Sequence, residues 1–196
     1  MAPWDVEAVA ASEAVEASVG AASPEVAAAS AAAAPEGDGE LNTPRRRRPK
    51  AFFDEEEERR IVGAIEAAER ATSGEIRVHL EHRCEGGDAY ERGRKVFEEL
   101  GMTATELRNG VLVYLATGDG VFSVLGDSGI HERVPEGFWD DVVELMTGHF
   151  ARDDFAGGLA AGIERIGEKL AEFFPYAGDE ADVNELPDEL SIEDPD

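Results

Sequence analysis

The sequence "NGVLVYLATGDGVFSVLG", residues 109–126, is the stretch of the chain that decides the fold. Its first eight residues form an almost unbroken apolar run, which is typical of a strand that is covered on both faces. The next four, "TGDG", have the composition of a tight turn, and "VFSVLG", residues 121–126, supplies a second strand. The stretch therefore predicts an antiparallel hairpin whose first strand is buried on both faces.

The segments on either side of this hairpin alternate between strand and helix patterns. Residues 75–82, "EIRVHLEH", alternate apolar and polar side chains and predict a strand, whereas residues 88–101 predict the helix that follows it. A helix capped by Asp54 precedes this strand. Two further helices follow the hairpin, and the second of them is capped by Asp153 or Asp154.

The predicted order of elements is therefore α-β-α-β-β-α-α. Because a helix joins the first two strands, they should be parallel with a right-handed crossover, and the third strand should run antiparallel to the second. We expect an α/β fold of the three-layer α/β/α sandwich type, built around a small mixed sheet and with a Rossmann-like outline.

The two ends of the chain differ in composition from its middle. Residues 1–50 are rich in Ala, Glu, Ser and Pro and close on the basic run "RRRRPK", so we expect a disordered tail there. Residues 51–176 carry the predicted domain, and residues 177–196 form an acidic tail that we also expect to be disordered. Three apolar side chains leave open that this second tail packs onto the domain: Val183, Leu186 and Leu190.

The charge of the chain limits its partners. It has 18 Lys and Arg residues against 44 Asp and Glu, a net charge of −26, which repels nucleic acids and anionic membranes. We therefore expect a protein partner and no membrane insertion. Only three of the basic residues are Lys, which indicates either a salt-adapted protein or a GC-rich genome. Without a visible export signal, and with Cys84 as its single cysteine, the chain is expected to be a cytoplasmic monomer.

The predicted strand order brings three glycine-containing loops to one edge of the sheet. The first two strands begin at the edge where the third one ends, so residues 73–75, 108–110 and 126–129 should converge. This edge would gather oxygen-bearing side chains, which are the ligands that Ca²⁺ and Mg²⁺ prefer. An equally open interpretation is that they are ordinary turn and capping residues. The candidate metal ligands are Asp127, Glu75, Asn109 and Glu132.

Two other motifs suggest chemistry but lack the context that the chemistry needs. Residues 126–129, "GDSG", match the tetrapeptide around the nucleophile of chymotrypsin-type proteases. A domain of this size cannot supply their fold or their distant His and Asp, so we interpret Ser128 as a turn residue. His79 and His82 would point to opposite faces of a strand and should not share a metal ion.

Four motifs stand in order along the chain: "TSGEIRV" at 72–78, "RNGVLVYLA" at 108–116, "GDSGIHERV" at 126–134 and "DDFAGGLAAGIERI" at 153–166. Together they resemble the TPM domain, which occurs in thylakoid-lumen acid-phosphatase-type proteins, bacterial membrane-anchored proteins and animal receptor modulators. The resemblance covers roughly residues 53–175, and the C-terminal tail is similar to that of a short, soluble bacterial branch. It implies a compact α/β/α domain.

The resemblance implies two different functions for the loop edge. Most bacterial members have no established activity, which favours a non-catalytic module that binds another protein, with or without a divalent cation. Some plant members bind calcium and have phosphatase activity. That favours a metal-assisted phosphatase, with Asp127 and Glu75 as ligands or base and Arg77 or Arg108 holding phosphate. Arg108 stands where many members have an acidic residue, and it can neutralise Asp127 or Glu75 directly.

Overall fold

The fold is known from a computed structural model, which describes residues 8–10, 27–32, 48–176 and 190–193. A mixed sheet in the order β1-β2-β5-β4-β3-β6 forms its middle layer. The strands are β1 (Ala8–Ala10), β2 (Ala27–Ala32), β3 (Ile76–Glu81), β4 (Val111–Ala116), β5 (Val121–Gly126) and β6 (Ser191–Glu193).

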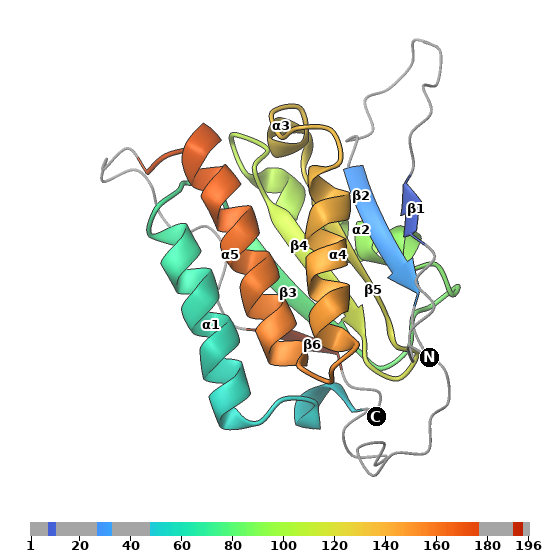
Figure 1. The fold of residues 1–196 in the computed structure, drawn as a ribbon. Coiled ribbons are helices and arrows are strands. Elements are labelled where there is room, and N and C mark those ends of the chain that lie inside the picture. Colours follow the sequence, from blue (N-terminus) through green and yellow to red (C-terminus); the bar gives the residue numbers. More distant parts are fainter. Residues whose placement is uncertain (1–7, 11–26, 33–47, 177–189, 194–196) are drawn as a thin grey trace.

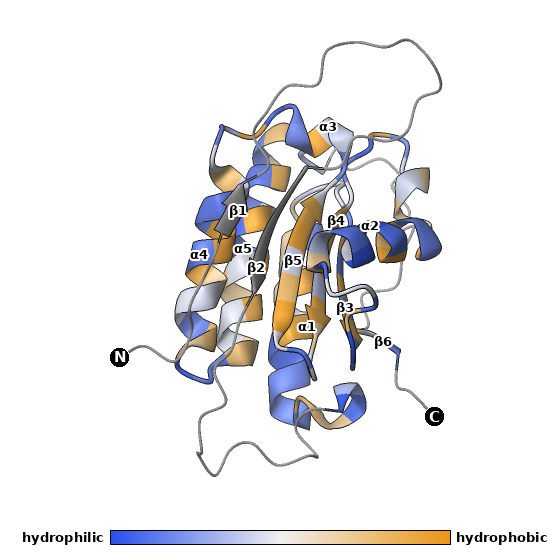
Figure 2. Cartoon of the chain, turned by 90° about the vertical axis from the view of Figure 1, so that its right-hand side faces the viewer, coloured by the Kyte–Doolittle hydropathy of each residue, from blue (hydrophilic) through white to orange (hydrophobic). Residues whose placement is uncertain are grey.

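Helices cover both faces of this sheet, which confirms the predicted three-layer sandwich. Three long helices lie side by side over one face, and α2 lies on the other (Figures 1 and 2). None of the helices in the described part of the chain is long and apolar enough to cross a membrane. The helices are α1 (Glu55–Glu69), α2 (Ala89–Glu99), α3 (Ser128–His131), α4 (Phe138–Phe150) and α5 (Phe155–Phe173), with 3-10 turns η1 (Pro49–Ala51) and η2 (Met102–Ala104).

The hairpin and its parallel neighbour run in the predicted directions. Strand β3 is parallel to β4, with Ile76 opposite Val111, and β4 is antiparallel to β5, with Val111 opposite Gly126. The first two strands thus begin where the third ends. This register sets which loops meet at the edge of the sheet.

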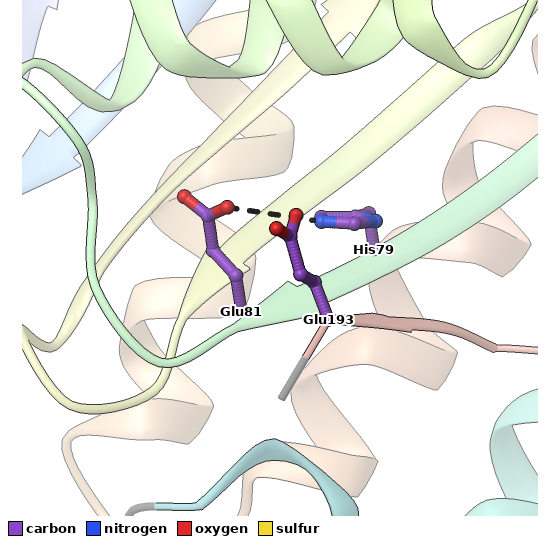
Figure 3. A group of neighbouring side chains, drawn as sticks. All are labelled: His79, Glu81 and Glu193. Atoms are coloured by element: carbon purple, nitrogen blue, oxygen red, sulfur yellow. Dashed lines mark ion pairs between the residues drawn. The ribbon is translucent and has the colours of Figure 1, made fainter. Parts of the chain in front are cut away.

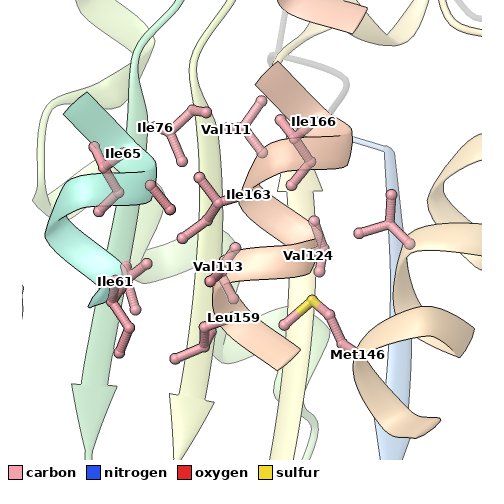
Figure 4. Close-up of a cluster of buried hydrophobic side chains, with 14 of the residues drawn as sticks. Ile61, Ile65, Ile76, Val111, Val113, Val124, Met146, Leu159, Ile163 and Ile166 are labelled. Carbon is pink, nitrogen blue, oxygen red and sulfur yellow. The ribbon is translucent and has the colours of Figure 1, made fainter. Parts of the chain in front are cut away.

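The apolar run of β4 faces two separate cores, as its pattern predicted. Val111, Val113 and Leu115 belong to the larger core between the sheet and the three long helices, part of which is shown in Figure 4. The alternate residues Leu112 and Tyr114 belong to a smaller core beneath α2. Because both faces are covered, every residue of β4 is buried.

Side-chain caps define where the helices begin. The Asp54 carboxylate accepts hydrogen bonds from the backbone N–H groups of Glu56 and Glu57, both at 2.9 Å. Glu57 in turn accepts from the Asp54 backbone N–H, which completes a capping box. Of the two caps considered for the last helix, the structure selects Asp154, which accepts from the Gly157 N–H at 2.9 Å.

Two short pieces of the N-terminal segment pair with the sheet. Strand β2 pairs antiparallel with β5, and β1 pairs with β2, so two pieces of residues 1–50 belong to the sheet. Composition did not reveal this because strand pairing uses backbone N–H and C=O groups, which every residue except Pro offers to an open sheet edge. The other residues before Arg48 lie outside the described part of the chain, and the domain boundary at residue 51 stays a prediction.

The C-terminal segment adds the strand at the opposite edge of the sheet. Strand β6 runs parallel to β3, and Leu190 and Ile192 pack half-buried against the larger core. Leu190, one of the three apolar residues considered for packing of the tail, therefore contacts the domain. Val183 and Leu186 lie outside the described residues.

Candidate functional site

Backbone hydrogen bonds bring the three predicted loops together at one edge of the sheet. The Val111 N–H donates to the Glu75 carbonyl at 2.8 Å, and the Asp127 N–H donates to the Gly110 carbonyl at 2.9 Å. The Asn109 side-chain amide donates to the Ser73 carbonyl at 3.1 Å. We refer to residues 73–75, 107–110 and 127–129 as the loop edge.

An ion pair between Arg108 and Asp127 lies at the centre of the loop edge. The guanidinium donates from Nε to Oδ2 and from Nη2 to Oδ1 of Asp127, both at 2.8 Å. The Asp127 carboxylate is 0% exposed and also accepts from the Ser128 backbone N–H at 2.7 Å, which caps α3. A carboxylate offers about four acceptor sites, and three N–H groups occupy this one. Arg108 thus supplies internally the positive charge that a metal ion would bring.

The backbone around this pair is held in a tight geometry. Arg108 has φ 53°, in the left-handed region that a long side chain rarely adopts. Gly129 packs so closely on the loop that a Cβ there would lie 2.2 Å from the Leu107 carbonyl oxygen and 2.7 Å from that of Arg108. The loop is therefore pressed against α3, and it presents Leu107 to solvent with 51% of the residue exposed.

The remaining predicted ligands occupy different environments. Asn109 and Glu75 are buried at the loop edge, whereas Glu132 is exposed at the end of α3. Arg77 is buried and, by alternation along β3, points to the face that α2 covers. In the described part of the chain, the carboxylates of Asp127, Glu75 and Glu132 do not form a group whose oxygens all lie within 4.8 Å of one another.

Ser128 begins α3 and has no histidine partner among the described residues. Its Oγ lies 3.4 Å from Asp127 Oδ1. His131, three residues later, accepts instead a hydrogen bond from Trp139 Nε1 at 3.3 Å. A nucleophilic serine needs a base within hydrogen-bond reach, so this geometry does not favour a nucleophilic Ser128, which is instead the first residue of the short helix α3.

A second polar cluster, which sequence reasoning missed, lies between β3 and α2. Arg92 donates from Nε to both oxygens of Glu81 at 3.1 Å and from Nη2 to Oε2 at 2.9 Å. The Tyr114 hydroxyl donates to Glu81 Oε1, and burial together with this hydrogen bond raises the tyrosine pKa. One signal was available: Arg92 falls at helical spacing with Ala89 and Val96, on the buried face of α2.

His79 extends this cluster toward the C-terminal strand. Its Nδ1 lies 3.0 Å from Ser191 Oγ, and its Nε2 lies 4.0 Å from Glu81 Oε2. Burial lowers the pKa of His79 to about 4, although the Glu81 charge opposes this shift. His79, Glu81 and Glu193 point toward one another, with possible ligand atoms within 4.8 Å (Figure 3). His79 thus meets two carboxylates, those of Glu81 and Glu193.

The fold and the loop edge together define a small three-layer α/β/α domain whose loop edge is closed by an internal ion pair. The sequence model of the TPM domain matches residues 47–169, so the chain belongs to the TPM domain family, as its motifs indicated. The chain is also similar to the BA42 protein of the psychrophilic bacterium Bizionia argentinensis, whose NMR structure matches with 44% identity and a TM-score of 0.66. That match covers 72% of this chain and 96% of BA42. No curated protein matches the chain.

Proposed function

We propose that this TPM-domain protein is a non-catalytic module that binds another protein through its loop edge. The observation that carries the proposal is the fork of two 2.8 Å hydrogen bonds between Arg108 and the fully buried Asp127. Two parallel charge-assisted bonds of this kind are strong and directional. A divalent cation or a phosphate-bound metal would have to displace a guanidinium that already balances the carboxylate.

The geometry of the loop edge also suits recognition better than catalysis. Its three loops are tied to one another by the backbone and side-chain bonds of Val111, Asp127 and Asn109. A surface that is rigid before binding loses little conformational entropy on association. Leu107 of the loop edge, with 51% of the residue exposed, provides an apolar contact for a partner.

The alternative function for the same residues is that of a metal-assisted phosphatase. It would need Asp127 and Glu75 as metal ligands or base and an arginine that is free to bind phosphate. Arg108 is engaged by Asp127, and Arg77 lies on the α2 face of β3. Turnover of a generic phosphate ester by the wild-type chain, lost in Asp127→Asn, would establish the phosphatase instead.

Site-specific photo-crosslinking tests the partner-binding function. A photoreactive residue is placed at Leu107 and, as a matched control, at Leu145 of α4, which is also exposed at 38% but lies outside the loop edge. In cells that produce the full chain, we expect a discrete crosslinked protein from position 107 only. Equal crosslinking from both positions, or none from 107, would contradict the proposal.

A further inference from the structure

We propose that His79, Glu81 and Glu193 form a binding site for a transition-metal dication, Zn²⁺ in particular, which the C-terminal strand β6 closes (Figure 3). The site lies between the sheet and α2, separate from the loop edge, and uses none of its residues. Two of the ligands come from β3, and the third comes from the segment that packs beside it. The inference does not rest on the proposed function.

The orientation of His79 is the observation that points to a ligand. The residue is 5% exposed, and its Nε2 atom is buried without a hydrogen-bond partner among the described residues. When Nδ1–H donates to Ser191 Oγ at 3.0 Å, the lone pair is on Nε2 and faces Glu81. Histidines that bind metals are held in this way, with the second ring nitrogen donating to an acceptor that fixes the tautomer.

Glu81 would bind an ion by exchanging one of its hydrogen bonds with Arg92. Three donor groups hold its carboxylate: the Tyr114 hydroxyl and the Nε and Nη2 groups of Arg92. The Arg92 Nε–H is shared between Oε1 and Oε2 at 3.1 Å each, so four hydrogen bonds reach the carboxylate. An ion bound at Oε2, which faces Nε2 of His79, would replace the shared bond. Tyr114 and Arg92 then act as outer partners that orient a metal-binding carboxylate.

The charges around the site favour a dication. Arg92 contacts three carboxylates: Glu81, Glu99 at 3.2 Å and Glu193 at 3.3 Å. Arg92 and these three carboxylates carry a net charge of −2, and Arg77, on the same face of β3, adds one positive charge. A bound dication would balance the three carboxylates together with Arg92.

The spacing of the ligand atoms needs only a small adjustment to hold zinc. Bonds of about 2.0–2.2 Å in a tetrahedron place neighbouring ligand atoms about 3.3–3.6 Å apart. His79 Nε2 and Glu81 Oε2 lie 4.0 Å apart, and Glu193 is 65% exposed, so its side chain is able to move inward. One imidazole with two carboxylates suits Zn²⁺, whereas Ca²⁺ takes six to eight oxygen ligands.

Calorimetric titration of the chelator-treated full chain with ZnCl₂ tests the site. We expect one saturable Zn²⁺ site in the wild type and at least about tenfold weaker binding in Glu193→Gln. Glu99→Gln is the matched control, because Glu99 is similarly exposed at 59% and contacts the same Arg92 but is not in the ligand group. The Zn²⁺ affinity of Glu99→Gln should stay within about threefold of that of the wild type, since this change removes only a charge that does not contact the ion.

NMR of the histidine rings identifies the ligand independently of the carboxylate variants. Zn²⁺ should shift the Nε2 resonance of His79 and leave His82, His131 and His149 in place. The absence of saturable binding, equal weakening in Glu193→Gln and Glu99→Gln, or an unshifted His79 would each overturn the site. Asp127→Asn should leave Zn²⁺ affinity unchanged, so this proposal and the loop-edge function can fail separately.

Discussion

At the scale of single residues, Arg92 and Glu81 form an ion pair in which both side chains are buried. Glu81 is satisfied by the guanidinium and by Tyr114. The hydrogen bond to Glu81 is the main cause that raises the pKa of Arg92. Removing one member of such a pair leaves the other charge buried without compensation.

We therefore expect Arg92→Ala to lower the free energy of unfolding by about 3–5 kcal/mol. Arg94→Ala, on the exposed side of the same helix, removes pairs with Glu91 and Glu98 and should cost less than about 1 kcal/mol. Urea unfolding of the two variants provides the comparison. Similar losses in both would show that Glu81 does not depend on Arg92.

The second prediction at this scale concerns Arg108. Arg108→Asp replaces the internal cation by an acidic residue, and Asp tolerates the left-handed backbone at this position better than Arg does. The variant should bind Ca²⁺ with a dissociation constant on the order of 10⁻⁴–10⁻³ M, because two carboxylates then face each other without a guanidinium. Calorimetry should detect no Ca²⁺ binding by the wild type.

Two further changes in the Arg108→Asp background locate the ion. Adding Asp127→Asn should abolish Ca²⁺ binding, whereas adding Ser128→Ala should leave it nearly unchanged, since Ser128 Oγ makes only a 3.4 Å contact with Asp127. Ca²⁺ binding by the wild type as tight as by Arg108→Asp would show that the guanidinium does not block the site.

At the scale of elements, the close approach of α2 to β5 depends on a glycine. A Cβ at Gly93 would lie 2.7 Å from Ser123 Oγ and 2.8 Å from a Leu125 methyl carbon. Ser123 Oγ is itself engaged by the Ala89 carbonyl at 2.8 Å, so it cannot move without losing that bond. The helix therefore packs against the strand at a distance that only glycine allows.

Gly93→Ala should consequently destabilise the protein by about 1–3 kcal/mol, because the added methyl group overpacks this contact. Gly63 in α1 is the matched control, since nothing lies within 4 Å of a Cβ there. Gly63→Ala should stabilise the protein by about 0.5–1 kcal/mol through helix propensity alone. Thermal unfolding that moves in the same direction for both variants would argue against close packing at Gly93.

At the scale of the whole molecule, the net charge of −26 is the dominant property. Carboxylates that repel one another destabilise the compact state, and added salt screens this repulsion. We expect the melting temperature of the full chain to rise between low and molar KCl. A melting temperature that stays constant or falls with added KCl would contradict the interpretation of the chain as a salt-adapted protein.

The sequence by itself determined the order of the four long helices and the strands β3, β4 and β5, the directions of these three strands and the convergence of the loop edge. These features follow from local signals: the apolar run of residues 111–116, the turn "TGDG" and the cap at Asp54. A helix between two strands then leaves few topologies, so the meeting of Gly110 with Asp127 could be predicted without the structure.

Only the tertiary structure decided which polar side chains pair and which strands lie at the edges of the sheet. Alternation placed Arg77, His79 and Glu81 on one face of β3, but it did not show which side chains meet them there, where all six residues of β3 are buried. Arg92 covers that face, and its contact with Glu193 spans 101 residues of sequence. Pairings of this kind, like those of β2 and β6 with the sheet edges, arise from chain segments meeting in space and leave no local pattern in the sequence.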